Sequence, residues 1–478
     1  MSMSSYAMAA RMMLRPILPN PLIPTLIAMA AIIRRILSSV VHVLYSLAVV
    51  VLALVLSPWF LYQAIRYRKY VGSLGQRMGV LPVTFNLDGD DSIWIHAVSV
   101  GEALTARALI PELRERYPDL KLFLSTTTMT GQQIARERLS DLDAVFFFPF
   151  DLQPFVSRTL RLVRPRLFIM METEIWPNLL RACRKAGVKT MMANGRISSR
   201  SYPRYRMARG FFRTVLADVD QFCMQSDESA RRIIDIGAEQ ARVSVTGSLK
   251  FDSLESPTAA AGRGAGRVLR FFRIPESRPV LMAASTMKGE EAAALTAFGM
   301  VRRTHPTAML IMAPRKPERF DEAVALVRAE GLRVARRTEL IVDTEPAADV
   351  VVLDSIGELA HLFQVATAVF VGGSLVDHGG HNILEPAVHG KAIVFGPHMQ
   401  NFAEIAEAFL GRRAAVQVAT AAELGEVWAR LLTDATERAR LGAAARELVE
   451  ANRGAKARTL AAVAALLPPP GPRLVRTR

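Results

Sequence analysis

The chain has 478 residues, more than one hydrophobic core usually holds, so we expect two domains. Hydrophobic residues make up 51% of it and charged residues 22%, a balance that excludes a disordered chain. The net charge is +16, yet no Asp or Glu precedes Asp88, and that first segment carries eight basic residues. A nucleic-acid-binding surface spread over the whole chain does not predict this asymmetry, whereas a segment beside a membrane does.

An uncharged stretch at residues 36–65 follows the first basic residues and contains the run SLAVVVLALVL at positions 46–56. It is longer than the ~20 apolar residues that span a bilayer. Trp59 and Tyr62 come at its end with several basic residues, as in an interfacial belt. We predict a membrane anchor rather than a cleaved signal peptide, because the run starts late and no small-residue cleavage site follows.

From residue 92 onward, short apolar runs rich in β-branched and aromatic residues alternate with helical patterns. This rhythm predicts parallel, doubly wound sheets with the chemistry in loops at the strand carboxyl ends. In the first half, the expected strands lie at residues 92–98, 121–127, 144–150, 166–171, 188–194, 221–225 and 242–247. In the second half, they lie at residues 279–286, 307–314, 350–354, 367–373, 391–396 and 414–418.

The fold class is therefore α/β, with two Rossmann-like domains and an N-terminal membrane-anchoring helix. A stretch of small residues between the two halves reads as a linker. The expected parts are a basic, proline-broken segment at 1–35, the anchor at 36–65, a first domain at 66–252, a linker at 253–275, a second domain at 276–420, C-terminal helices at 421–467 and a disordered tail at 468–478.

Polar residues follow several strands of the first half. Glu102 comes after a glycine turn at the first strand end, where it is either a capping carboxylate or a general base. Thr127 and Thr128 follow the second strand and either bind a sugar or phosphate or cap the next helix. Glu172 and Glu174 follow another strand beside a tryptophan, an arrangement typical of carbohydrate contacts, although Pro177 also marks a helix start there.

Glycines dominate the stretch at residues 372–402 of the second half. Gly372 and Gly373 end a β-branched run, and a second glycine pair precedes a short helix that Asn382 opens. Bare backbone N–H groups and a helix N-terminus bind phosphate, and Glu385 would accept hydrogen bonds from ribose hydroxyls. The alternative is an ordinary tight connection between a strand and a helix.

Two further loops of the second half carry groups suited to a phosphate. Ser285 and Thr286 form a hydroxyl-bearing helix entry, and Arg315 and Lys316 place basic groups at a strand end. Such groups neutralise a leaving phosphate.

Eight motifs occur in a fixed order along the chain. They are SVGE at 99–102, ETEIWPN at 172–178, NGRIS at 194–198, GSLKFD at 247–252, ASTxxGEE at 284–291, PRxxxR at 314–319, GGSLxxxGGHNxLEP at 372–386 and GPHxxNF at 396–402. This combination resembles the 3-deoxy-D-manno-octulosonic acid (Kdo) transferases of bacterial lipopolysaccharide core assembly, over about residues 60–420. The departures are Met287, where the family usually has His, and Lys316, where it often has His.

The resemblance implies a GT-B glycosyltransferase fold, with two Rossmann-like domains facing across a cleft. It implies transfer of Kdo from CMP-Kdo to a lipid A precursor (lipid IVA) at the cytoplasmic face of the inner membrane, with inversion. It implies no metal, no cofactor and no nucleic-acid partner. Glu102 would be the catalytic base.

The resemblance also assigns the remaining site residues. Donor binding would fall to Ser285, Thr286, Arg315, Lys316, Gly372, Gly373, Ser374, Asn382 and Glu385. The acceptor would be bound, or the base supported, by Thr127, Thr128, Glu172, Glu174, Asn194 and Arg196.

Three other interpretations remain open at this stage. A metal hydrolase is suggested by the cluster of Asp377, His378, His381 and Glu385, but its spacing matches no common zinc signature. A second interpretation is another membrane-associated GT-B glycosyltransferase that uses a different sugar nucleotide. A third is a membrane-tethered nucleotide-binding protein without catalysis, for which Glu102 would be dispensable.

Overall fold

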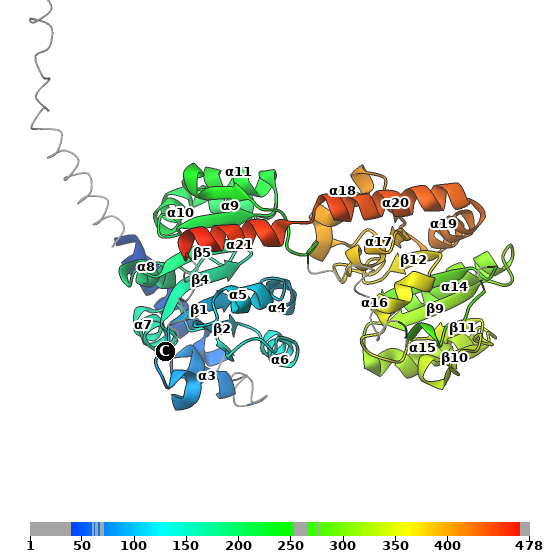
Figure 1. The fold of residues 1–478 in the computed structure, drawn as a ribbon, viewed down its shortest axis with the longest axis horizontal. Coiled ribbons are helices and arrows are strands. Elements are labelled where there is room, and N and C mark those ends of the chain that lie inside the picture. The colour runs from blue at the N-terminus through cyan, green and yellow to red at the C-terminus, as the bar shows by residue number, and fades with distance from the viewer. Residues whose placement is uncertain are drawn as a thin grey trace, which may run out of the picture. The chain divides into compact units, whose positions relative to one another are not determined.

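The computed structural model describes residues 40–59, 62, 66, 71–252, 266, 268–275 and 277–468. The chain forms two compact units (Figure 1), Met1–Val245 with Leu460–Arg478 and Thr246–Thr459. Each is a parallel sheet covered by helices, as the alternation predicts. The segment expected at 1–35, most of the linker and nearly all of the tail lie outside the described residues.

The first unit contains a seven-stranded parallel sheet in the order β3-β2-β1-β4-β5-β6-β7. Its strands are β1 (Ser92–His96), β2 (Lys121–Thr126), β3 (Ala144–Phe147), β4 (Pro165–Met171), β5 (Lys189–Gly195), β6 (Gln221–Met224) and β7 (Val243–Val245). The chain winds outward from β1 to β3 and then returns to the other side of β1 with β4. The pair β1 and β4 is therefore the switch point of this sheet.

Helices follow the strands of the first unit in the expected places. They are α3 (Val71–Arg77), α4 (Val100–Ala106), α5 (Ile110–Arg116), α6 (Met129–Arg138), α7 (Gln153–Val163), α8 (Pro177–Lys185), α9 (Tyr202–Met207), α10 (Arg209–Leu216) and α11 (Asp227–Asp235), with 3-10 turns η1 (Val83–Asn86) and η2 (Gln240–Arg242). Trp94 of β1 and Phe168 of β4 pack in the core of this unit, with ring centroids 4.8 Å apart. The central strands are thus held rigidly beneath the loops that they carry.

The second unit repeats the plan with the order β10-β11-β9-β8-β12-β13-β14, again all parallel. Its strands are β8 (Val280–Thr286), β9 (Met309–Pro314), β10 (Val334–Arg336), β11 (Val350–Val352), β12 (Ala368–Val371), β13 (Ala392–Phe395) and β14 (Val416–Gln417). Its switch point lies between β8 and β12. The sequence missed β10, because this edge strand has three partly buried residues, one of them charged, and so no apolar run.

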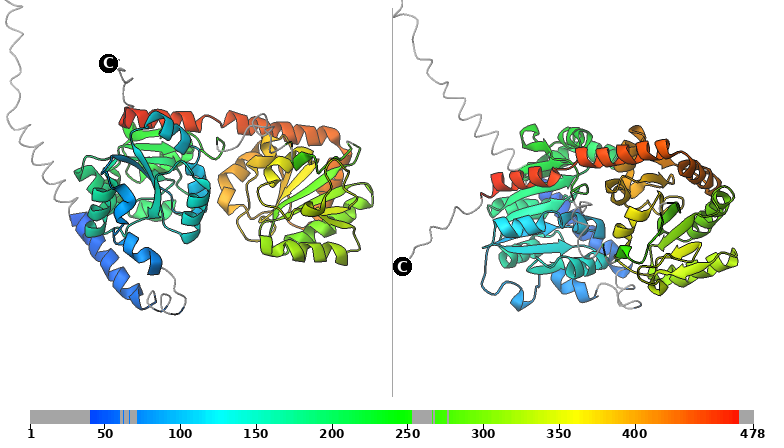
Figure 2. Two further views of the ribbon diagram at one scale, coloured as in Figure 1. Left: turned by 60° about the horizontal axis from the view of Figure 1, so that its bottom comes forward. Right: turned by 45° about the vertical axis from the view of Figure 1, so that its right-hand side comes forward.

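Helices cover both faces of the second sheet (Figure 2). They are α14 (Glu290–Arg302), α15 (Phe320–Ala329), α16 (Leu359–Leu362), α17 (Leu384–Val388), α18 (Ala403–Gly411), α19 (Ala421–Thr433) and α20 (Ala435–Ala451), with 3-10 turns η3 (Pro317–Arg319), η4 (Arg337–Glu339), η5 (Phe363–Val365) and η6 (Gln400–Phe402). Along β12, Ala368 and Phe370 face one core with α14, α15 and α19, whereas Val369 and Val371 face the other with α17, α18 and α20. Both faces of the strand are buried, as expected of a parallel sheet.

The C-terminal helices expected at 421–467 are present as α19, α20 and α21. Helices α19 and α20 cover the second sheet, and the last helix, α21 (Ala455–Leu466), carries the chain back to the first unit. There the hydroxyl of Tyr117 donates to the carbonyl of Leu467 at 2.6 Å. The sequence pattern identifies these helices but carries no information about which sheet each one joins.

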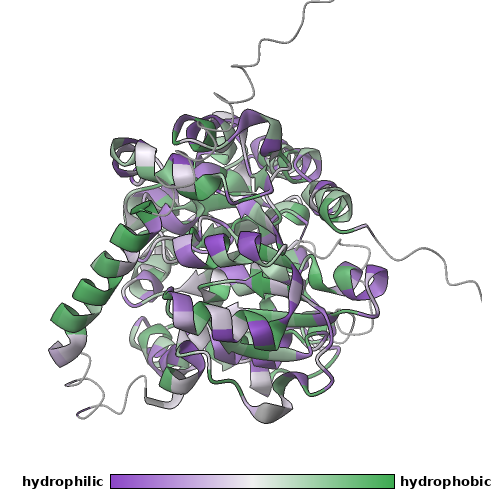
Figure 3. Cartoon of the chain, turned by 90° about the vertical axis from the view of Figure 1, so that its left-hand side faces the viewer, coloured by the Kyte–Doolittle hydropathy of each residue, from purple (hydrophilic) through white to green (hydrophobic). Residues whose placement is uncertain are grey.

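One helix of the described chain, Val40–Trp59, is long and apolar enough to cross a bilayer, with a mean hydropathy of 2.5 (Figure 3). Its second half is exposed and apolar; Leu54 and Val55, for example, are 67% and 68% exposed. Its first turns contact the first unit, where the hydroxyl of Ser46 lies 3.3 Å from the side-chain oxygen of Asn178. The helix gives weak support to the predicted anchor.

Candidate active site

The two strands at the switch point of the first sheet carry the carboxylates that the sequence singled out. Glu102 lies in the first turn of α4, just after β1, and Glu172 and Glu174 lie in the loop after β4. Because β1 and β4 are adjacent and parallel, both loops emerge at the same edge of the sheet. The topology therefore brings together residues about 70 positions apart in the sequence.

Glu102 is both a capping residue and a member of this cluster. One of its oxygens accepts from the backbone N–H of Val98 at 2.8 Å, and the other accepts from the hydroxyl of Ser99 at 2.9 Å. Ser99 in turn is the N-cap of α4 and accepts from the N–H of Glu102. These bonds hold the carboxylate in one orientation at the strand edge.

The environment gives Glu102 the protonation behaviour of a base that works near neutral pH. Burial and the charge of Glu172 raise its pKa to about 7, against the lowering effect of its hydrogen bonds. Burial and the charge of Glu102 likewise raise the pKa of Glu174 to about 7. Glu102 and Glu174 are therefore both partly protonated near neutral pH.

The backbone is strained at the ends of the neighbouring strands. Glu172 after β4 and Asn194 in β5 both have φ of 56°, a left-handed conformation that is uncommon outside glycine. In the second unit, Ser285 at the end of β8 has the same φ. Such residues gather at functional sites, where surrounding contacts maintain the strain. The residue types alone do not predict this left-handed conformation.

Thr127 and Thr128, which follow β2, differ in how their hydroxyls are hydrogen-bonded. Thr128 is the N-cap of α6, since its hydroxyl oxygen accepts from the N–H of Gly131 at 3.1 Å. It also donates to the carbonyl of Val98 at 3.2 Å, so its hydroxyl is committed within the fold. The hydroxyl of Thr127 is buried and has no hydrogen-bond partner within the described residues. Of the pair, Thr127 is therefore the one whose hydroxyl has no role in the hydrogen bonding of the described fold.

His96 at the end of β1 was not among the predicted site residues. Burial lowers the pKa of its imidazole to about 3, so the ring is neutral. It stacks on Phe148 with centroids 3.9 Å apart, its Nδ1 lies 2.9 Å from the hydroxyl of Ser125, and its Nε2 has no partner within the described chain. Its position just before the SVGE motif was the one available signal.

At the switch point of the second unit, the glycine loop is already occupied by a carboxylate. The N–H groups of Gly373 and Ser374 donate to Glu290 at 2.6 Å and 2.9 Å. The hydroxyl of Ser374 is also engaged, since it accepts from the N–H of Gly396. The sequence predicts open N–H groups at Gly372, Gly373 and Ser374, whereas in the structure Glu290 accepts from those of Gly373 and Ser374. Donor binding by these three residues stays a prediction.

Thr286 also faces the interior rather than a ligand. It is fully buried, and its hydroxyl donates to Glu291 at 3.1 Å. Glu291 forms a bidentate ion pair with Arg319 at 3.1 Å and 2.9 Å. The predicted contact of Thr286 with the donor stays a prediction, and Ser285 beside it is half-buried.

Two exposed basic groups lie at this edge. Arg315 and Lys316 are both exposed after β9. Burial, together with the charge of Arg315, lowers the pKa of His381 to about 4. The Nε2 of His381 is buried without a partner in the described residues. Asn382 donates to Glu385 at 3.0 Å and accepts from the N–H of Leu384 at 3.1 Å, which fixes the start of α17.

The structure gives no support to the metal-hydrolase interpretation. No group of His, Cys, Asp and Glu in the described part of the chain is arranged to hold a metal ion. Asp377 instead lies 3.6 Å from His398 and accepts a hydrogen bond from Gln400.

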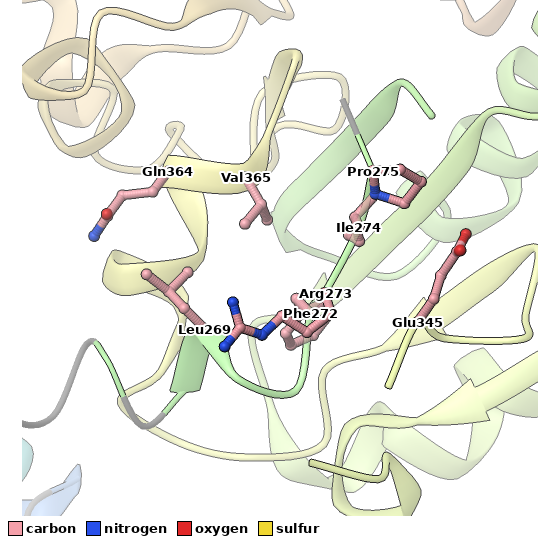
Figure 4. A pocket seen from close by; sticks show the side chains of 8 residues that line it. All are labelled: Leu269, Phe272, Arg273, Ile274, Pro275, Glu345, Gln364 and Val365. Atoms are coloured by element: carbon pink, nitrogen blue, oxygen red, sulfur yellow. The ribbon is translucent and has the colours of Figure 1, made fainter. Parts of the chain in front are cut away.

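A cavity of about 520 Å³ lies elsewhere in the second unit (Figure 4). Its walls include Leu269, Phe272 and Ile274, which precede β8, and Val365, which precedes β12. These residues lie before the amino ends of the strands, whereas the polar loops follow their carboxyl ends. The cavity is therefore not the site that the switch point defines.

Two doubly wound parallel sheets with polar loops at their switch points define the class, the two-domain α/β plan of GT-B glycosyltransferases. The solved UDP-GlcNAc 2-epimerase of Neisseria meningitidis has a similar fold, with a TM-score of 0.54 over 78% of this chain and 99% of that one. At 11% identity this likeness shows the fold alone.

The sequence comparisons narrow the class to one family. Residues 72–253 match the family model described as 3-deoxy-D-manno-octulosonic-acid transferase (kdotransferase). The 3-deoxy-D-manno-octulosonic acid transferase of Haemophilus influenzae is 33% identical over 77% of this chain and 85% of its own length. That of Bordetella pertussis is 34% identical over 78% and 86%. The chain belongs to the Kdo transferase family and is a glycosyltransferase.

Proposed function

We propose that this chain transfers Kdo from CMP-Kdo to a lipid A precursor, lipid IVA, with inversion and without a metal ion. The observation that carries the proposal is Glu102, a nearly buried carboxylate with a pKa of about 7 at the switch point of the first unit. A general base works best when its pKa lies near the pH at which it operates. Family membership supports Kdo as the sugar that is transferred.

In the proposed step, an oxygen of Glu102 takes the proton of the acceptor hydroxyl. The hydroxyl oxygen forms the new bond to the anomeric carbon of Kdo, and the bond from that carbon to the phosphate oxygen of CMP breaks. Attack on the face opposite the departing phosphate inverts the configuration, and the transition state has oxocarbenium character. Glu172 keeps the pKa of Glu102 high, which makes that carboxylate a stronger proton acceptor.

On the donor side, charge neutralisation is proposed to come from protein groups. The exposed Arg315 and Lys316 carry positive charge close to the glycine loops, and guanidinium groups bind phosphate through paired N–H donors. Glu385, half-buried in α17, is proposed to accept hydrogen bonds from the cytidine ribose. These groups supply the stabilisation of a departing phosphate that other enzymes obtain from a metal ion.

The apolar helix supports a membrane-bound acceptor. Lipid IVA is a phosphorylated glycolipid that lies in a bilayer, and Val40–Trp59 is long enough to hold the enzyme beside it. We place the enzyme at the cytoplasmic face of the inner membrane.

The test is Kdo transfer by the detergent-solubilised protein, with CMP-Kdo and lipid IVA, in the presence of a chelator. We expect product from the parent, a loss of about a thousandfold or more in Glu102→Ala, and little change in the matched control Glu115→Ala, an exposed glutamate of α5. Mass spectrometry of the product counts the Kdo residues added. If CMP binds but no sugar is transferred, the acceptor assignment fails and another sugar nucleotide must be sought.

A further inference from the structure

A single carboxylate fills the concave face of the glycine loop in the second unit. Glu290, the first residue of α14, accepts four backbone hydrogen bonds: its Oε2 from Gly373 at 2.6 Å and Met287 at 2.9 Å, and its Oε1 from Ser374 and Leu375, each at 2.9 Å. Its side chain is fully buried. A ring of backbone N–H groups around one anion is the geometry of a phosphate-binding nest.

The charge of Glu290 is balanced by dipoles rather than by a cation. Among the described residues, none forms an ion pair with it, whereas the neighbouring Glu291 is paired with Arg319. Four amides and the N-terminus of α14 supply the stabilisation that a buried carboxylate needs. An uncharged side chain of the same size does not satisfy these four donors.

The contact is as close as glycine permits. A Cβ at Gly372 would lie 2.8 Å from Oε2 of Glu290 and 2.7 Å from the carbonyl oxygen of Ser285. Gly373 has φ of +67°, which other residues rarely adopt. The loop after β8 and the loop after β12 are therefore held together as one body, with Glu290 as the connection.

A third loop depends on the same carboxylate. Ser374, which Glu290 holds, accepts from the N–H of Gly396 through its hydroxyl at 2.8 Å and from the N–H of His398 through its carbonyl at 2.9 Å. A Cβ at Gly396 would lie 2.2 Å from that carbonyl oxygen. The hydrogen bonds thus continue from α14 through the glycine loop to the loop after β13.

We propose that Glu290 is a positioning residue of the donor site, an internal anion that takes the place a phosphate would occupy and fixes all three loops around the switch point. The donor phosphate is then directed to groups outside the nest, namely Arg315, Lys316 and the unpartnered nitrogen of His381. The assignment of these loops to donor binding rests on the proposed function, whereas the ordering of the loops by Glu290 does not.

The first test uses Glu290→Gln, which keeps the size of the side chain but turns an NH₂ group toward two N–H donors. We expect faster hydrogen–deuterium exchange in the peptide covering residues 372–376 and a KM for CMP-Kdo raised by about tenfold or more. The KM for lipid IVA should be unchanged. The matched control is Glu291→Gln, in the same helical turn and equally buried, which should lower thermal stability without loss of protection in residues 372–376.

Glu290→Ala, which vacates the nest, provides a second test that rests on rescue by an added anion. Formate or acetate should enter the vacated nest and restore exchange protection and donor KM in this variant but leave Glu291→Gln unchanged. Unaltered protection and donor KM in Glu290→Gln, or no response of Glu290→Ala to either anion, would overturn the proposal. If the parent transfers no Kdo but protection still depends on Glu290, the proposed function fails and the positioning role stands.

Discussion

At the scale of single residues, the candidate site contains carboxylates whose pKa is raised by burial and by a neighbouring carboxylate. Glu102 and Glu174 each have a pKa raised to about 7 by burial first and by a neighbouring carboxylate second. Each is protonated over part of the range in which an isolated glutamate is charged. The catalytic proposal therefore leads directly to a dependence on pH.

Activity should rise with pH through about 7, because Glu102 accepts a proton only when it is deprotonated and its pKa is about 7. Replacing Glu172 by Gln removes the nearby negative charge that raises this pKa, so the acid limb of the profile should move to lower pH. The measurement is kcat/KM for Kdo transfer between pH 5 and 9. A limb that stays in place in Glu172→Gln would show that Glu172 does not act on the base.

At the scale of elements, loop residues of the same type have different roles, because only some of them cap the N-terminus of the helix that follows. Thr128 satisfies the N-terminus of α6 and Ser99 that of α4, whereas the adjacent Thr127 has a buried hydroxyl with no partner in the described chain. Glu290, in the first turn of α14, accepts hydrogen bonds from the backbone of the loop after β12, which belongs to a different strand. Neighbouring hydroxyls should therefore respond differently to substitution.

Thr128→Ala should lower the free energy of unfolding by about 1 kcal/mol, because the N–H of Gly131 loses its cap. Thr127→Val keeps the shape of the side chain and should leave stability within about 0.5 kcal/mol of the parent while raising the KM for lipid IVA. Denaturant unfolding and steady-state kinetics on the two variants measure both effects. The assignment fails if Thr127→Val alters stability as much as Thr128→Ala does.

At the scale of the whole molecule, the first turns of an apolar helix contact the first unit. His42, Tyr45 and Ser46 contact that unit, and Tyr45 lies with its ring 6.0 Å from Phe211 of α10. Beyond these turns most of the side chains are exposed and apolar. A helix with this division is expected to leave the protein surface and enter a bilayer.

Glutamates at Leu47, Val51 and Val55 should release the protein from membranes, since each charged residue near the bilayer centre costs about 3 kcal/mol. All three side chains are more than half exposed, so the folded first unit should be unaffected. Alkaline extraction of membrane fractions followed by immunoblotting measures the distribution. Leu87→Glu, at a leucine that is 68% exposed outside the helix, is the control and should stay in the membrane fraction.

The sequence alone determined the class of fold and most of the strands, because continuous apolar runs between helical patterns are a local signal of buried parallel strands. It also placed Glu102, Glu172 and Glu174 at strand ends. The sequence did not predict β10, because its three partly buried residues form no continuous apolar run. Nor did the sequence show which unit α19, α20 and α21 join, because an apolar helix face can pack against any apolar surface.

Only the tertiary structure decided which of the polar loop residues are available for chemistry. The glycine loop read as an open phosphate site, yet its amides bind Glu290, which lies more than 80 residues earlier in the chain. The pKa of Glu102 depends on burial and on Glu172 across the switch point. Local residue patterns cannot encode these effects, because each arises from distant residues that strand order brings together.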